Sequence, residues 1–223
     1  MAHLDIRLLG PFEAALDGQP IMAFESNKVR ALLAYLIMER HQPHRRETLA
    51  ALLWPESTSS AAAASLRNAL ANLRTALGDR DASPPFLDVT RETVQFNSES
   101  DYSLDVAALL APNGEGVGTE TRATCEQLAD AAALYRGPFM EGLALRDSVT
   151  YDDWQAIVRE RLHRLALGTL EQLATGLERR ADLDGACEAV RQQIALEPWY
   201  EEAHRDLMRL LAAEGQRTAA LQQ

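Results

Sequence analysis

The stretch SAAAASLRNALANLRTALG, residues 60–78, is rich in helix-forming residues and contains no acid. The whole chain holds 33 acidic and 22 basic side chains, yet Arg67 and Arg74 are the only charged residues from position 57 to position 78. An alanine-rich surface helix can lack acids by chance. The absence alone therefore indicates no function, and the two faces of the expected helix have to be compared.

Leucines recur through this stretch at helical spacing and predict one narrow apolar stripe that faces the core. The stripe consists of Leu66, Leu70, Leu73 and Leu77. The opposite face is small and polar, with Ala64, Asn68, Ala71 and Thr75 flanked by Arg67, Arg74 and Asn72. Arginine pairs with guanine, asparagine pairs with adenine, and a carboxylate would repel the flanking phosphates. This face therefore suits the major groove of DNA, and a bland surface helix remains the alternative.

The segments on either side of this helix follow a recognisable order. Alternating apolar residues from Leu4 to Leu16 predict short antiparallel strands, and helical spacing follows from Ser26 to about Glu39. A short helix begins near Arg46 and ends before Pro55. The stretch PPFLDVTRETVQFN, residues 84–97, then predicts a β-hairpin. Strands, three helices and a hairpin are the layout of a winged helix, whose third helix enters the groove.

A basic cluster precedes the short helix and offers a possible phosphate-facing patch. It consists of Arg40, His41, His44, Arg45 and Arg46. The alternative is a solvated turn in which Arg46 pairs with Glu47 or another acid. The sequence leaves both interpretations open.

The second half of the chain reads differently. A linker is expected at residues 106–118, because positions 111–118 hold three glycines and a proline. Every later segment is expected to be helical. Ala186 and Ala219 are 33 positions apart, close to the ~34-residue period of tetratricopeptide repeats. We expect residues 119–223 to form a tetratricopeptide-like domain that is truncated at its C-terminus, because the sequence stops inside a predicted helix.

Charge and motifs limit the class of protein. Residues 1–105 carry 10 basic and 14 acidic side chains, and residues 106–223 carry 12 and 19, so any DNA-binding face has to be a local patch. No P-loop, GxGxxG, HExxH or GxSxG motif occurs, and no cysteine or histidine pattern suits a metal. We expect no catalysis, no cofactor and no metal, and a cytoplasmic protein without membrane association.

Residues 1–105 resemble the OmpR-type winged-helix domain of the Streptomyces antibiotic regulatory protein (SARP) family of activators. The resemblance rests on LLGPFEAALDGQP, NKVRALLAYLIMER, RRETLAALLWPE, SLRNALANLRTALG and the following hairpin. The second half is similar to that family's partner module, the bacterial transcriptional activator domain. Its matching segments are ALYRGPFMEGL, DDWQAIVRERLHRLALGTLEQLA and ALEPWYEEAHRDLMRLLAAEGQRTAAL.

The resemblance implies a mainly α fold with small antiparallel β elements: an N-terminal winged helix-turn-helix domain, then an all-α tetratricopeptide-like domain. It also implies a sequence-specific transcriptional activator that binds direct repeats in double-stranded promoter DNA, associates with itself there and contacts RNA polymerase. The alternative is a repeat-based protein-interaction or ligand-sensing adaptor in which DNA binding is secondary.

The same resemblance assigns roles to particular residues. Arg67, Asn68, Ala71 and Asn72 would lie near bases, Arg74 near phosphate, and Arg91 at the tip of the wing. The full set of expected DNA contacts is Ser60, Ala64, Arg67, Asn68, Ala71, Asn72, Arg74, Thr75, Arg45, Arg46 and Arg91. Related recognition helices often carry more basic residues, so cooperative binding is expected. The loop from Pro55 to Ser60 either meets polymerase or simply caps the helix.

Overall fold

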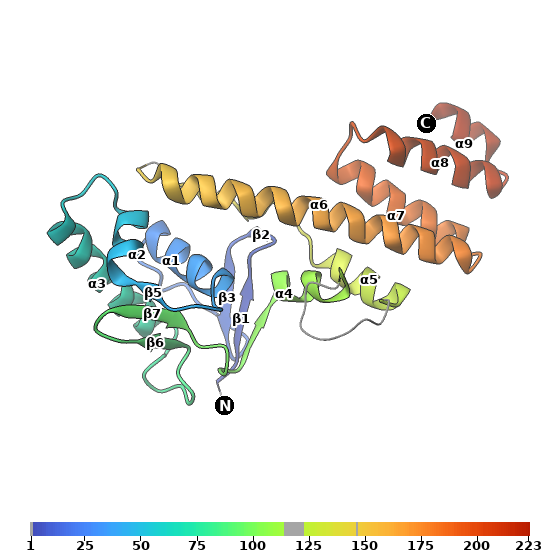
Figure 1. The fold of residues 1–223 in the computed structure, drawn as a ribbon. Helices are drawn as coiled ribbons and strands as arrows, with labels where there is room; N and C mark the ends of the chain where they lie inside the picture. The colour runs from blue at the N-terminus through green and yellow to red at the C-terminus, as the bar shows by residue number, and fades with distance from the viewer. Residues whose placement is uncertain (1, 114–122, 146) are drawn as a thin grey trace. The chain divides into compact units, whose positions relative to one another are not determined.

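The computed structural model describes residues 2–113, 123–145 and 147–223, which are mostly helical with short strands (Figure 1). The chain divides into two compact units, Met1–Asp105 with Gly137–Arg159 and Val106–Arg136 with Glu160–Gln223. This division differs from the boundaries predicted above, because residues 137–159 pack with the first unit. Part of the predicted linker, residues 114–118, and the first residues of the helical domain expected at 119–223 lie outside the described residues.

A four-stranded sheet opens the first unit. Its strands run in the order β4 (Gln19–Pro20), β3 (Glu13–Leu16), β1 (Leu4–Arg7) and β8 (Tyr102–Leu104). The antiparallel pairing of β1 with β3 confirms the alternation expected from sequence, since Leu4 and Ile6 are fully buried. Strand β8 joins on the other edge of β1 in parallel, a pairing that no local pattern predicts.

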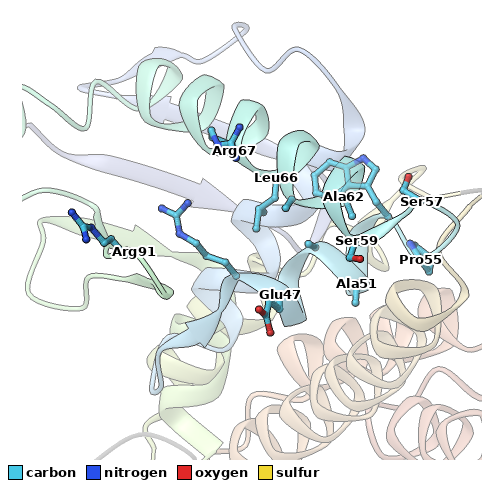
Figure 2. Close-up of a pocket in the computed structure, with 13 residues that line it drawn as sticks. Glu47, Ala51, Pro55, Ser57, Ser59, Ala62, Leu66, Arg67 and Arg91 are labelled. Carbon is cyan, nitrogen blue, oxygen red and sulfur yellow. The ribbon is translucent and has the colours of Figure 1, made fainter.

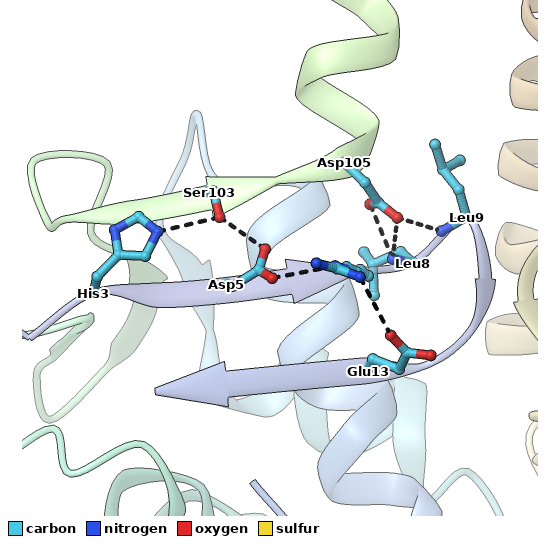
Figure 3. Close-up of polar contacts among 8 residues, drawn as sticks. His3, Asp5, Leu8, Leu9, Glu13, Ser103 and Asp105 are labelled. Carbon is cyan, nitrogen blue, oxygen red and sulfur yellow. Dashed lines mark hydrogen bonds and ion pairs between the residues drawn. The ribbon is translucent and has the colours of Figure 1, made fainter. Parts of the chain in front are cut away.

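Polar side chains connect β1 and the residues just after it to β8 and Asp105, which are far apart in sequence (Figure 3). Asp105 follows β8, and its buried carboxylate accepts hydrogen bonds from the backbone N–H groups of Leu8 and Leu9, each at 2.9 Å. The Ser103 hydroxyl donates to Asp5 at 2.8 Å. Asp105 therefore satisfies two buried amides where β1 ends.

Three helices follow in the expected order: α1 (Asn27–Met38), α2 (Arg46–Leu53) and α3 (Ser59–Ala76). The Thr58 hydroxyl caps α3 by accepting from the amide of Ala61, and Gly78 ends it with a φ of 60°, a conformation that suits glycine. The predicted leucine stripe is confirmed, because all four of its side chains are at most 4% exposed. Helix α3 therefore packs through its leucines and leaves its other face outside.

The expected hairpin is confirmed as β6 (Leu87–Val89) and β7 (Thr93–Phe96), which pair in antiparallel fashion. A third strand that the sequence analysis did not anticipate, β5 (His44–Arg45), pairs with β7. Because β5 directly precedes α2, it attaches the hairpin to the start of that helix (Figure 1).

The expectation that every segment after the linker is helical is wrong at one place. Strand β9 (Phe139–Glu141) pairs in parallel with β2 (Gly10–Pro11). Phe139 and Met140 are fully buried there, and the ring of Phe139 lies 5.9 Å from that of Trp154 in α6 (Val149–Arg179). A three-residue strand carries too little periodicity to be recognised in sequence.

The second unit is built from helices. These are α4 (Asp105–Leu110, all but its first residue), the 3₁₀ turn η1 (Ala111–Asn113), α5 (Cys125–Ala133), the end of α6, α7 (Leu183–Leu196), α8 (Glu201–Ala213) and α9 (Arg217–Gln222). Leu128, Leu173, Val190 and Leu207 belong to their common core. The described part of the predicted linker is therefore helical. It packs into the protein, since Val106 and Leu109 are buried. None of the described helices is long and apolar enough to cross a membrane.

Tyr151 gives a first prediction. Its hydroxyl is buried without a hydrogen-bond partner among the described residues. Burial raises the pKa of this hydroxyl, and the negative charge of nearby Asp152 raises it further. We expect Tyr151→Phe to raise the free energy of unfolding by about 1 kcal/mol, because an unsatisfied buried polar group is removed at constant shape. Urea denaturation followed by circular dichroism measures this change. Tyr135→Phe is the matched control: it loses the hydrogen bond to His163 and should lower stability.

Candidate nucleic-acid interface

The outer face of α3 carries most of the residues predicted to meet DNA. Ser60, Arg67, Asn68, Ala71 and Thr75 are exposed, and Ala64 is half-buried. The Thr75 hydroxyl donates to the Ala71 carbonyl at 3.0 Å, as serine and threonine often do within helices. The face therefore consists of small and polar side chains and carries no negative charge.

The side chains of Arg67 and Asn68 make no hydrogen bond or ion pair with any described residue, unlike those of Asn72 and Arg74. An arginine fork and a side-chain amide are the two groups that read guanine and adenine in a bidentate manner. Both groups are therefore available on the surface of α3.

Asn72, which was also predicted to lie near bases, has an intramolecular role. Its side-chain oxygen accepts from the amide of Glu25 at 3.1 Å, and its nitrogen donates to the carbonyl of Ala23 at 3.1 Å. The amide therefore fixes the segment that leads into α1. Its predicted base contact remains untested, but it would require these two hydrogen bonds to break.

Arg74 is similarly engaged. Its Nε donates to Asp79 at 2.7 Å, and the Asp79 side chain is fully buried. The other oxygen of that carboxylate accepts from the amide of Leu87 at 2.9 Å. Arg74 and Asp79 therefore connect the end of α3 to the first strand of the hairpin, and the predicted phosphate contact of Arg74 would compete with this ion pair.

The hairpin turn brings two further arginines toward α3. The backbone amide of Arg46 donates to the Glu92 carbonyl at 2.9 Å, and its Nε donates to the Thr90 carbonyl at 3.1 Å. Arg46 is thus bound to the hairpin backbone, and among the described residues it forms no ion pair with Glu47 or another acid, the partners that the alternative interpretation named. Arg91 is exposed at the same turn.

The basic cluster before α2 is only partly a surface patch. Arg45 is exposed, as a phosphate contact requires, but His44 is 7% exposed and packs against Tyr35 with ring centroids 5.2 Å apart. Its Nε2 lies 3.0 Å from the Glu39 carbonyl. His44 therefore does not belong to a phosphate-facing patch, because its ring is buried against α1.

A cavity of about 510 Å³ lies between α2, α3 and the hairpin turn (Figure 2). It brings together three predicted contacts, Arg46, Arg67 and Arg91, which come from three separate elements. Its other lining residues are Glu47, Ala50, Ala51, Trp54, Pro55, Ser57, Ser59, Ala62, Ala63 and Leu66. This cavity could not be recognised in the sequence, because its walls meet only in the folded chain.

Chemically, this region favours anions. The lining includes three guanidinium groups and one carboxylate, that of Glu47, and arginine pairs readily with phosphate or carboxylate groups. In the part of the chain that the structure describes, no group of three or more histidine, cysteine or acidic residues could hold a metal ion.

The loop from Pro55 to Ser60 is exposed, and its Thr58 caps α3, in agreement with the capping interpretation.

Comparison with known proteins gives the class of this chain. Residues 107–223, just over half of the sequence, match the family model of the bacterial transcriptional activator domain. The chain therefore belongs to the bacterial transcriptional activator domain family.

The most informative relatives are mycobacterial. The chain is 31% identical over 145 residues to the transcriptional regulatory protein EmbR of Mycobacterium bovis and of Mycobacterium tuberculosis. This match covers 63% of the chain but 37% of each relative, so the chain matches just over a third of their length. These names describe transcriptional regulators and not enzymes.

A solved structure shares the fold. It is that of Mycobacterium tuberculosis EmbR in complex with a low affinity phosphopeptide, with a TM-score of 0.71 and 22% identity. The likeness covers 99% of this chain and 57% of that one. The mainly helical fold with small sheets is therefore shared with a known protein.

Proposed function

We propose that this chain is a DNA-binding transcriptional regulator, an activator whose first unit is a winged helix with α3 as the recognition helix. The observation that carries the proposal is the acid-free outer face of α3, on which Arg67 and Asn68 have no hydrogen-bond or ion-pair partner among the described residues. Membership of the bacterial transcriptional activator domain family and the names of the relatives support the regulatory role.

In this proposal α3 lies in the major groove. Arg67 donates to guanine, Asn68 pairs with adenine, and the methyl group of Ala71 leaves room for a close approach to a thymine methyl. Arg45 and Arg46 face the phosphates beside the helix, and Arg91 enters the neighbouring groove from the hairpin turn. Asn72 and Arg74 support the geometry of α3 from within the protein.

The chain's charge bears on affinity. With a net charge of −11, the protein gains attraction to DNA only through this local patch. Binding by several copies on direct repeats would multiply the few contacts that each copy makes. We therefore propose that the protein associates with itself on DNA. We also propose that, as an activator, it contacts RNA polymerase.

The central test is DNA binding by the variants Arg67→Ala and Asn68→Ala. Sites are first selected from a random duplex pool with the unmodified chain. Each substitution is expected to weaken binding to the selected site by about 1–3 kcal/mol, roughly 5- to 150-fold, and to relax preference at one base position. Mobility-shift titrations at several salt concentrations measure both effects.

Arg205→Ala is the matched control, because Arg205 is exposed on α8 in the second unit and makes no polar contact with the described residues. It should leave the affinity unchanged. If the unmodified chain binds no duplex with steep salt dependence, the protein-interaction adaptor becomes the better assignment. If it binds DNA but both α3 variants bind equally well, α3 is not the recognition helix.

A further inference from the structure

The cavity between α2, α3 and the hairpin turn is more apolar than contact with a DNA backbone requires. Seven of its lining residues are apolar: Ala50, Ala51, Trp54, Pro55, Ala62, Ala63 and Leu66. Its volume of about 510 Å³ lies within the range of about 300–1,000 Å³ typical of small-molecule sites. Such sites combine apolar walls with a few polar groups, as this one does.

The two kinds of lining are separated in space. Figure 2 shows Arg67 and Arg91 toward the hairpin end of the cavity, while Ala51, Ala62 and Pro55 lie toward the other end. Among the described residues, neither of these arginines has a hydrogen-bond or ion-pair partner. One end therefore presents positive charge without a partner among the described residues, and the other presents an apolar wall.

Trp54 gives the apolar wall a fixed surface. Its ring is half-buried at the end of α2, and the Lys28 ammonium lies 5.2 Å from the ring centroid. Lys28 in turn donates to Asp147 at 2.6 Å, which holds it in place and lowers the pKa of that carboxyl. A flat apolar body could pack against this ring without rearrangement of α2.

We propose that this cavity binds a small amphipathic anion, a molecule with a flat apolar body and one carboxylate or sulfonate group. The body lies on the wall formed by Trp54, Ala62 and Leu66, and the anionic group is held by Arg67 and Arg91. The inference rests in one respect on the proposed function. Because the same two arginines are assigned to DNA, the ligand and DNA exclude one another.

The experiment uses a matched pair of probes on the full chain. 8-Anilinonaphthalene-1-sulfonate is a flat apolar anion, and N-phenyl-1-naphthylamine has the same body without the sulfonate. Fluorescence titration is expected to show saturable binding of the anion to one site. The double variant Arg67→Ala/Arg91→Ala should weaken binding of the anion by about tenfold or more and leave the neutral probe unchanged.

Two further variants test whether the probe lies in the cavity. Ala63→Phe adds a ring to the cavity wall and should abolish binding of both probes, whereas Ala61→Phe, at an exposed α3 position outside the cavity, should affect neither. Ala51→Phe fills the same cavity from α2. It shows whether the effect of Ala63→Phe comes from filling the cavity or from a change in α3 alone. Melting temperatures confirm that each variant is folded. Unchanged binding in both filling variants would overturn the proposal.

Displacement by DNA completes the test. Addition of the selected duplex to the probe-loaded protein should release the anionic probe, and simultaneous binding would overturn the proposed exclusion. The two proposals fail in different ways. Probe binding that responds to Ala63→Phe, in a protein that binds no DNA, refutes the proposed function and keeps the ligand site. DNA binding without a saturable probe site does the reverse.

Discussion

Replacement of Asp105 by alanine is expected to lower the free energy of unfolding by about 3–5 kcal/mol. The Asp105 carboxylate satisfies the amides of Leu8 and Leu9, and both leucines are fully buried. Without it, two backbone N–H groups remain in the core without an acceptor, and each costs about 1–3 kcal/mol. That loss is a large fraction of the stability of about 5–15 kcal/mol usual for a protein.

Urea denaturation followed by circular dichroism measures the change through the shift in midpoint at constant slope. Asp105→Asn should also be destabilised, because its amide retains only one acceptor oxygen for two donors. Asp88→Ala is the control, since Asp88 is exposed on β6 and its side chain makes no hydrogen bond with any described residue. A midpoint for Asp105→Ala equal to that of Asp88→Ala would show that the two amides find other acceptors.

The sequence predicted those parts of the fold that repeat locally. The leucine stripe of α3 and the alternation of β1 both follow from side-chain periodicity, and both are buried as expected. Glycine at position 78 and the hairpin were also predictable, because their conformations depend on a few adjacent residues. The role of Asp105 was not, since its partners lie 96 and 97 positions away.

The candidate site shows the same division. Arg67 and Arg74 are one residue type, seven positions apart on one helix, and both were expected to contact DNA, Arg67 at bases and Arg74 at phosphate. Folding separates them, because Asp79 reaches Arg74 while no described acid reaches Arg67. Asn68 and Asn72 separate in the same way, through the segment at Ala23. The cavity depends on three distant elements and could not be read from any one of them.

This distinction matters for mutagenesis of α3. DNA binding measured alone in an alanine scan does not distinguish a lost DNA contact from a destabilised fold at either arginine. The two losses are expected to have different causes, a missing DNA contact at Arg67 and a destabilised fold at Arg74. Stability measured beside DNA binding separates the two.

Arg74→Ala is therefore expected to lower the free energy of unfolding by about 3 kcal/mol, whereas Arg67→Ala should change it by less than about 0.5 kcal/mol. Removal of Arg74 leaves the fully buried carboxylate of Asp79 without its counter-charge, while Arg67 forms no ion pair with any acid that the structure describes. Asp79→Asn in the Arg74→Ala background should recover part of the loss, because an amide carries no charge to desolvate.

DNA binding by the same variants at low temperature then separates contact from fold. Far below its melting temperature the Arg74→Ala protein is folded, and its affinity for the selected duplex should approach that of the unmodified chain, whereas Arg67→Ala should remain weak. Equal stability of the two arginine variants would contradict the structural role of Arg74. In that case the Asp79 carboxylate tolerates isolation, and a direct phosphate contact by Arg74 becomes the better explanation for any loss of binding.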